Sequence, residues 1–327
     1  MTVDTNIRRP LGEERSLVCE VTGLELQGSG AIVVLTLAPA DGRELPSWTP
    51  GAHIDVLMDN GIERQYSLCG DVAPGEPWRI GVLREPQSRG GSEYMHTSVS
   101  VGQHLTLQGP RNNFEVVDAP AYQFIAGGIG VTPILPMIRK VEAEGKPWRL
   151  MYGGRSSSSM AFLDEISQYD GHVTLWPQDT AGIIPVRDLV SALEPGTAVY
   201  CCGPEPLLNA VEDAMSHLPA DQLHVERFRP RQDLLEQVRT PFDIVLDYSE
   251  LELHVPADKT IIEVVEAAGL EVMSSCREGT CGTCETVVLS GSPDHRDSYL
   301  TAAEKASNEV MMICCSRSKS PRLVLDL

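Results

Sequence analysis

The stretch Cys276-Arg-Glu-Gly-Thr-Cys281-Gly-Thr-Cys284 is followed by Cys314, so four cysteines stand at C-x4-C-x2-C…C spacing. This is the ligand spacing of a plant-type [2Fe–2S] cluster. Gly279 and Gly282 lie between the cysteines, and glycine lets a loop fold tightly while its N–H groups point at the sulfurs. The stretch predicts a ferredoxin-like unit and a low-potential carrier of single electrons.

A structural zinc site and disulfide bonds are the alternatives to a cluster for these cysteines. Zinc ribbons pair one C-x2-C with another, which the x4 spacing and the distant Cys314 fit poorly. The chain has nine cysteines, an odd number, and we expect it to be cytoplasmic, which favours metal ligands or free thiols over disulfides. A Rieske centre does not fit, because no histidine replaces a cysteine in the loop.

Length and charge narrow the class of protein. The 327 residues are enough for two or three domains of roughly 100 residues each. The sequence has no run of eighteen apolar residues and no secretory signal, so we expect no membrane span and a cytoplasmic location. The net charge of −20 argues against nucleic acid and anionic membranes as partners, since both are polyanions.

The composition changes several times along the chain. Residues 1–15 are polar and without periodicity, and predict a flexible tail. Short β-branched runs bounded by turn residues predict an antiparallel β-barrel over residues 16–118. Strand–helix alternation predicts a Rossmann-like α/β domain with a parallel sheet over residues 119–229. Residues 230–241 predict a linker, and residues 242–327 an α+β unit that contains the cysteine loop.

A glycine-rich turn follows the predicted strand 123–126 and opens a predicted helix at Thr132 and Pro133. Glycines there would let a pyrophosphate approach backbone N–H groups, although a plain tight turn is the alternative. Two more turns end strands of the same sheet. In the turn at residues 152–156, Arg155 either binds a ribose or phosphate or is an ordinary solvated side chain. In the turn at residues 201–205, Cys202 either lies near a nicotinamide or is a small buried thiol.

The barrel contains a motif that suits a mononucleotide. If Arg64-Gln65-Tyr66-Ser67 is a strand, Arg64 and Tyr66 share one face and Ser67 lies on the other. These residues provide a cation for phosphate, an aromatic ring for stacking and a hydroxyl for a ring nitrogen. The companion turn Ser88-Arg-Gly90-Gly91-Ser92 precedes a predicted short helix. Without that companion, residues 64–67 would be an ordinary edge strand.

The whole set of motifs, over about residues 17–327, resembles the family of phthalate dioxygenase reductase. The resemblance implies an FMN-binding barrel, an NADH-binding domain and a C-terminal plant-type ferredoxin (β-grasp) domain. FAD and NADPH are the alternative cofactors. The matching stretches are Arg64-x-Tyr66-Ser67, Arg89-Gly-Gly-Ser92, Gly127-Gly-Ile-Gly-Val-Thr-Pro133, Cys202-Gly-Pro204, Glu226-x-Phe228, the cysteine loop, and Cys314-Cys-Ser-Arg317, which marks Cys314 as the fourth ligand.

The resemblance also implies roles for single residues. Arg64 and Ser92 would hold the flavin phosphate, Tyr66 would pack on the flavin, and Ser67 would face flavin N5. Cys202 would lie near the nicotinamide. The further residues implied to bind the flavin are Gln65, Val82, Leu83, Arg84, Gly90 and Gly91. Those implied to bind the nicotinamide nucleotide are Gly127, Gly128, Gly130, Thr132, Pro133, Arg155, Ser156, Gly203 and Pro204. Glu226 and Phe228 would lie where the flavin and the nicotinamide meet. The alternative for Phe228 is a linker residue that caps the sheet.

By this resemblance the protein is a monomeric oxidoreductase that passes electrons from NADH through FMN and the cluster to a terminal oxygenase. A Rieske-type oxygenase is the expected acceptor and a cytochrome P450 the alternative. Residues 243–327 contain fifteen Asp and Glu against seven Lys and Arg, so their surface would attract a basic partner. A flavin and iron–sulfur redox sensor is a hypothesis from another class, disfavoured because the sequence has no DNA-reading element.

Overall fold

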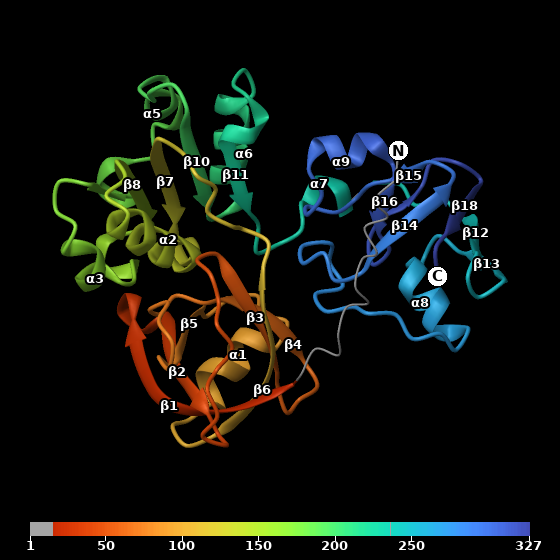
Figure 1. Ribbon diagram of the computed structural model, residues 1–327, viewed down its shortest axis with the longest axis horizontal. Coiled ribbons are helices and arrows are strands. Elements are labelled where there is room, and N and C mark those ends of the chain that lie inside the picture. Colours follow the sequence, from red (N-terminus) through yellow and green to blue (C-terminus); the bar gives the residue numbers. More distant parts are fainter. Residues whose placement is uncertain (1–15, 236) are drawn as a thin grey trace, which may run out of the picture. The chain divides into compact units, whose positions relative to one another are not determined.

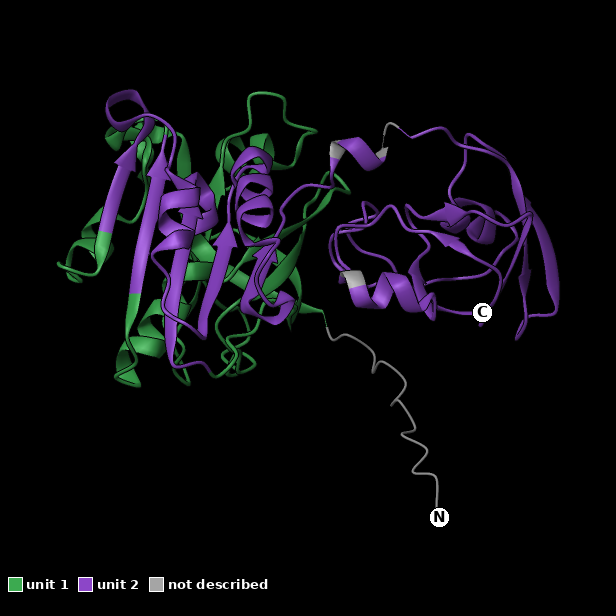
Figure 2. Ribbon diagram, turned by 90° about the horizontal axis from the view of Figure 1, so that it is seen from above, with its two compact units in different colours: residues 1–118, 132–148, 155–173 green, residues 119–131, 149–154, 174–327 purple. Residues whose placement is uncertain are grey.

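The computed structural model describes residues 16–235 and 237–327, so the predicted tail 1–15 lies outside the described residues. The chain divides into two compact units (Figure 2). The first contains residues up to 118 together with 132–148 and 155–173. The second contains residues 119–131, 149–154 and 174–327.

The first unit is built on a six-stranded antiparallel sheet in the order β4-β3-β6-β1-β2-β5 (Figure 1). A bridge between Leu68 and Ile80 joins the end of β4 to β5, so the sheet closes as a barrel. Apolar side chains such as Leu35, Ile54 and Trp78 fill its core. The elements are β1 (Leu17–Gln27), η1 (Gly28–Gly30), β2 (Ile32–Pro39), β3 (Ala52–Leu57), β4 (Glu63–Ser67), β5 (Trp78–Leu83), α1 (Gly91–Thr97) and β6 (His104–Asn112).

A five-stranded sheet in the order β11-β10-β7-β8-β9 follows. Its central strand β10 pairs in parallel with both β7 and β11, and every residue of β10 is buried, as expected for a strand inside a parallel sheet. The elements of this region are β7 (Ala121–Gly127), η2 (Gly128–Gly130), α2 (Val131–Ala143), β8 (Trp148–Gly154), η3 (Ser157–Ser159), α3 (Leu163–Ser167), β9 (Val173–Pro177), α4 (Gln178–Ala181), α5 (Val186–Ser191), β10 (Thr197–Cys202), α6 (Glu205–Met215), η4 (Ala220–Gln222) and β11 (Leu223–Glu226).

The C-terminal part of the second unit is a second five-stranded sheet, in the order β13-β12-β18-β14-β16, with a core that includes Ile244, Ile261 and Leu325. Helix α8 begins at a capping box, in which Thr260 and Glu263 bond each other's backbone N–H groups. The elements are α7 (Gln232–Leu235), β12 (Phe242–Leu246), β13 (Leu251–Val255), α8 (Ile261–Ala267), β14 (Glu285–Ser290), β15 (Pro293–Asp294), α9 (Ala302–Ser307), β16 (Val310–Met312), β17 (Arg317–Ser318) and β18 (Arg322–Leu325).

The predicted fold class is confirmed, since an antiparallel barrel, a parallel sheet and an α+β unit are all present. Several short elements were not predicted, namely α4, α7, β11, α9 and β15 to β17. The short helix α7 lies in the expected linker, β11 is a half-buried run of only four residues with two polar side chains, and α9 lacks a long apolar face. Within the described residues, we find no helix with the length and apolar character that crossing a membrane requires.

Candidate functional site

The four predicted ligand cysteines come together in the second unit. Cys276, Cys281 and Cys284 lie in the loop before β14, and Cys314 directly follows β16. Cys276 is half-buried and the other three are buried. Hydrogen bonds from the Cys281 and Cys314 thiols lower the pKa of the Cys276 thiol, and Cys314 also contacts Cys284. The loop therefore gathers four sulfurs in a largely buried position.

Two backbone N–H groups are directed at the Cys276 sulfur, and a side-chain hydroxyl contacts the Cys281 sulfur. The N–H groups of Glu278 and Thr280 lie 3.3 and 3.4 Å from Cys276 Sγ, and the Thr283 hydroxyl lies 3.2 Å from Cys281 Sγ. Hydrogen bonds to thiolate sulfur stabilise and tune an iron–sulfur cluster. Across residues 16–235 and 237–327, no three metal-binding side chains are grouped as a single ion requires. A [2Fe–2S] cluster takes two thiolates on each iron, and this donor set fits it.

The loop glycines allow close packing behind the cysteines. A Cβ on Gly279 would lie 2.4 Å from Cys315 Sγ, and a Cβ on Gly282 would lie 2.4 Å from the Tyr299 ring. Both glycines also have positive φ, of 74° and 77°. Any larger residue would push the loop away from the segment behind it, so these positions require glycine even before a cluster is considered.

In the barrel, Arg64 is a partly buried cation on β4. A Cβ on Gly91 would lie 2.7 Å from Arg64 Cγ, so the arginine stem passes directly over the turn before α1. The Arg64 guanidinium donates to the carbonyl oxygens of Glu63 (2.7 Å) and Arg89 (3.5 Å), and within the described chain it has no carboxylate partner. An arginine so placed fits an anionic group such as a phosphate.

The neighbours of Arg64 have different environments. Burial raises the pKa of Tyr66, so its phenol stays neutral, and Ser67 is buried opposite His53. Gln65 stands opposite Asp55 in the same ladder. Ser92, at the turn, donates its hydroxyl to Ser88 Oγ (3.0 Å).

Several predicted flavin positions already have protein partners. Ser92 Oγ accepts the Glu85 N–H at 3.2 Å, so this hydroxyl helps to hold the turn. The carbonyl of Val82 lies 2.9 Å from His96 Nε2. The Arg84 side chain is paired with Glu93 and its N–H with Ala31, while Leu83 is half-buried and Gly90 has a φ of 91°.

At the carboxyl edge of the parallel sheet, two turns interlock. A Cβ on Gly130 would lie 2.3 Å from the Cys202 carbonyl oxygen, and a Cβ on Gly127 would lie 2.5 Å from Pro204 Cδ. Gly203 is equally confined by the backbone of Gly127. Only Gly128 of the predicted motif points into open space, with a φ of 54°. The glycine motif thus serves the packing of β7 against β10 as well as any ligand.

The remaining predicted nucleotide positions differ in exposure. Thr132 and Pro133 are buried at the start of α2 in the first unit. Arg155 is exposed just after β8, and within the described chain its guanidinium has no partner. Ser156 forms a capping box with Ser159. Among the predicted nucleotide-binding residues, Arg155 therefore has a positive charge that is available to a ligand.

The register of β10 and β11 brings Cys202 and Glu226 together. Cys202 is fully buried, and its Sγ lies 4.0 Å from Glu226 Oε2. Desolvation raises the pKa of Glu226 to about 8, so this carboxyl is protonated at neutral pH. Phe228, two residues beyond β11, is 42% exposed. The contact between the two side chains could not be found from the sequence because it depends on the register of β10 and β11.

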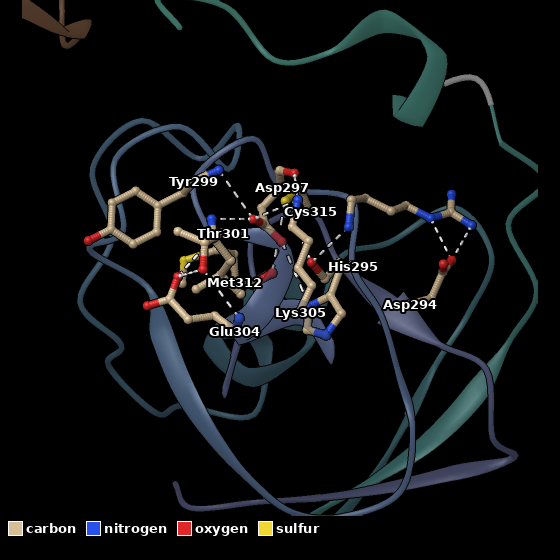
Figure 3. Close-up of polar contacts among 12 residues, drawn as sticks. Asp294, His295, Asp297, Tyr299, Thr301, Glu304, Lys305, Met312 and Cys315 are labelled. Carbon is tan, nitrogen blue, oxygen red and sulfur yellow. Dashed lines mark hydrogen bonds and ion pairs between the residues drawn. The ribbon is translucent and has the colours of Figure 1, made fainter. Parts of the chain in front are cut away.

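A polar network behind the cysteine loop also escaped sequence reasoning (Figure 3). The carboxylate of Asp297 is completely buried and accepts the N–H groups of Tyr299 (3.2 Å) and Leu300 (2.8 Å). Lys305 Nζ lies 3.4 Å from that carboxylate and donates to the Asp297 carbonyl at 2.7 Å. A single aspartate in a loop gives no sequence signal, so only the fold reveals this network.

Comparison with known proteins identifies two types of domain in this chain. Residues 244–319 match the 2Fe-2S iron-sulfur cluster binding domain, and residues 124–213 match the oxidoreductase NAD-binding domain. Phenoxybenzoate dioxygenase subunit beta from Ectopseudomonas oleovorans is 42% identical over 89% of this chain and 91% of its own length.

Two solved structures extend the comparison. An intact type IV self-sufficient cytochrome P450 monooxygenase shares 41% identity and a TM-score of 0.87 over 98% of this chain, which spans only 43% of that protein. The second is the structure of phthalate dioxygenase reductase, described as a modular structure for electron transfer from pyridine nucleotides to [2Fe-2S]. It is 35% identical to this chain, with a TM-score of 0.71, and the match covers 96% of this chain and 99% of the reductase chain. The chain therefore belongs to the family of phthalate dioxygenase reductase.

Proposed function

We propose that this protein is an NADH-dependent reductase that passes electrons through FMN and a [2Fe–2S] cluster to a terminal oxygenase. The observation that carries the proposal is the buried gathering of Cys276, Cys281, Cys284 and Cys314, with backbone N–H groups directed at a sulfur. A bound flavin would take two electrons as a hydride and release them singly, as a one-electron cluster requires.

The flavin would occupy the barrel, residues 16–118. The Arg64 guanidinium, without a carboxylate partner in the described chain, would bind its phosphate, and the neutral Tyr66 ring would pack on it. Ser67, Ser92 and the strand from Val82 to Arg84 would complete the pocket. FMN is preferred over FAD because the ferredoxin unit follows the other two in the chain, an order that goes with FMN in related reductases.

The nicotinamide nucleotide would bind the domain of residues 119–229. Gly128, which faces open space, offers a backbone approach for the pyrophosphate, and Thr132 and Pro133 would complete this site. Glu226, protonated at neutral pH, offers a proton or a hydrogen bond near Cys202, and Phe228 offers an exposed ring. NADH is preferred, although Arg155 has a charge that a 2′-phosphate would also attract.

The acceptor is an oxygenase that belongs to a separate chain, with a Rieske-type enzyme preferred. Relatives named as parts of dioxygenases support this choice. A cytochrome P450 is the second candidate, because a fused P450 contains a region with the same fold at 41% identity. The acidic residues of 242–327, joined by the linker 230–241, would attract a basic docking surface. We further infer a cytoplasmic monomer.

Absorption spectra of the reconstituted protein before and after anaerobic NADH would test this function. Bleaching of both the flavin and the cluster bands with excess NADH supports the relay, and bleaching of neither band contradicts it. The cofactor released by heat should elute as FMN, and kcat/KM should favour NADH over NADPH. Reduction rates measured with a purified Rieske oxygenase and a purified P450 distinguish the two acceptors.

A further inference from the structure

The expected linker is fastened to the ferredoxin unit by three side chains. Ser298 Oγ accepts the Arg231 N–H at 3.1 Å. The Arg296 guanidinium donates to the carbonyl oxygens of Gln237 (3.1 Å) and Val238 (2.8 Å). Arg317 donates to the Thr240 carbonyl at 2.9 Å. We call Arg296, Ser298 and Arg317 the linker clamp.

The two clamp arginines are buried, at 5% and 3% exposure. Arg296 is also held by Asp294, through its Nε at 2.8 Å. Arg317 donates further to the carbonyl oxygens of Lys259 and Pro256, and its guanidinium carbon lies 5.1 Å from the centre of the Phe242 ring. Burying two guanidinium groups is costly unless their donors are used. The buried Arg317 Nε has no hydrogen-bond partner within the described residues, but Arg296 Nε and the terminal nitrogens of both groups donate, so these contacts form a built interface.

Two of these residues, Ser298 and Arg296, also contact the segments that carry the cysteines, and Arg317 belongs to one of them. The N–H of Ser298 donates to the Gly279 carbonyl inside the cysteine loop at 2.8 Å. The N–H of Arg296 donates to Ser316 Oγ at 3.1 Å. Ser316 and Arg317 directly follow Cys314 and Cys315 in the sequence. Each clamp residue thus has the linker on one side and a cysteine-bearing segment on the other.

The segment between the clamp residues is itself rigidly held. Asp297, between Arg296 and Ser298, is fixed by Lys305 and by two backbone N–H groups (Figure 3). The backbone bonds at Ser298 and the buried Asp297 carboxylate together resist local motion. Ser298 therefore links the linker to the cysteine loop directly. Its hydroxyl accepts the Arg231 N–H, and its own N–H donates to the Gly279 carbonyl.

We propose that the clamp residues are positioning residues, which hold Arg231 and residues 237–240 of the linker to the cysteine loop as one rigid body. Any hinge between the NAD-binding domain and the ferredoxin unit then lies before Arg231, in a segment much shorter than 230–241. The clamp fixes the direction in which the chain leaves the cluster-bearing loop. Its effect on electron transfer rests on the proposed function, whereas its effect on the linker does not.

Tryptic cleavage of the holoprotein tests the clamp directly, since Arg231 and Arg239 lie in the clamped segment. Ser298→Ala removes one hydrogen bond, so cleavage after Arg231 should rise roughly fivefold, in proportion to the opened population. Ser298→Thr, which keeps the hydroxyl, should restore the slow cleavage. Ser307→Ala is the matched control, because that exposed hydroxyl donates to the Glu304 carbonyl and accepts the Glu309 N–H, both of them local contacts away from the linker.

Arg296→Met should accelerate cleavage after Arg239 in the same assay. Should that variant fail to fold, the comparison of Ser298→Ala with Ser298→Thr decides alone. Equal cleavage of Ser298→Ala, Ser298→Thr and the wild type would overturn the clamp.

A single-turnover experiment tests the positioning role. In Ser298→Ala, reduction of flavin by NADH should keep its rate, whereas the following reduction of the cluster should slow by roughly tenfold because the geometry is less well held. The electron paramagnetic resonance spectrum should retain full cluster content. Faster proteolysis with unchanged cluster reduction would overturn the positioning role. If NADH does not reduce the cluster of the wild-type protein, the proposed function is contradicted. The cleavage assay would then still test whether the clamp holds the linker.

Discussion

The cysteine loop and the carboxyl edge of the parallel sheet use glycine motifs in different ways. In the loop, the motif residues Cys276, Cys281 and Cys284 are the proposed ligands, and glycines fit the loop against Cys315 and Tyr299. At the sheet edge, Gly127 and Gly130 mainly fit one turn against another, and only Gly128 faces open space. In the cysteine loop, the spacing of the motif indicates the proposed ligands. At the sheet edge, the spacing of the glycines mostly reflects how the two turns pack together.

The two regions thus differ in whether their motif residues are proposed to carry out chemistry or to hold the fold together. A change at Cys281 should remove one redox step and leave the fold, because Cys281, unlike Cys284 and Cys314, is not part of the hydrophobic core of the ferredoxin unit. A change at Gly130 should damage the fold, because an added Cβ would meet the backbone of Cys202 and Gly203. Single substitutions can test this separation, beginning with the one of largest expected effect.

Cys281→Ser should abolish NADH-dependent reduction of cytochrome c, which needs the cluster. Reduction of ferricyanide, taken directly from the flavin, should remain largely intact. Steady-state assays with both acceptors on the same preparation check this, with flavin content as the control. Equal loss of both activities would contradict an ordered relay.

Gly130→Ala should destabilise the protein by about 2–4 kcal/mol, because the new methyl group would overlap the Cys202 carbonyl. Gly128→Ala is the matched variant. It meets no atom and should cost only about 1 kcal/mol for its positive φ. Urea unfolding gives both values, and similar losses in the two variants would refute the assignment of Gly130 to packing.

Glu226→Gln should change how stability depends on pH. The folded protein holds the Glu226 proton up to a pKa of about 8, compared with an ordinary value of 4.5. Its contribution to stability is therefore full below about pH 4.5 and is lost as the pH rises towards 8. Relative to the wild type, the glutamine variant should gain stability between pH 6 and pH 9. A constant difference across urea unfolding curves in this range would contradict the raised pKa.

Arg277→Ala should have the smallest effect. Arg277 pairs with Glu266 at 2.6 Å, but its side chain is 53% exposed, so the pair should contribute less than about 1 kcal/mol. Thermal unfolding with Glu266→Gln as the partner variant measures the coupling. A loss of several kcal/mol would show that this pair is part of the framework of the loop.

Much of the fold could be predicted because its strands and helices have clear patterns. The hairpin of β12 and β13 and the helix α8 lie almost where their apolar periodicity places them. The four cysteines were identifiable because their spacing reflects cluster geometry. Strand β11 was missed because its four residues, Leu-His-Val-Glu, alternate without a buried face.

The tertiary partners of the site could not be predicted. Cys202 and Glu226 are twenty-four positions apart and meet only through strand register, which no local pattern encodes. The attachment of Arg231 to Ser298 joins residues even further apart in the chain. Such contacts follow from how elements pack, so the sequence indicated the ligands but not the groups that hold them.

Anaerobic titration with NADH, followed by electron paramagnetic resonance, tests the central claim most directly. We predict that NADH produces the signal of a reduced [2Fe–2S] cluster, approaching one per chain, in the wild type. Cys281→Ser, loaded with the same flavin, should lack that signal while its flavin is still reduced. Reduction of the flavin in the wild type with no cluster signal would contradict the relay.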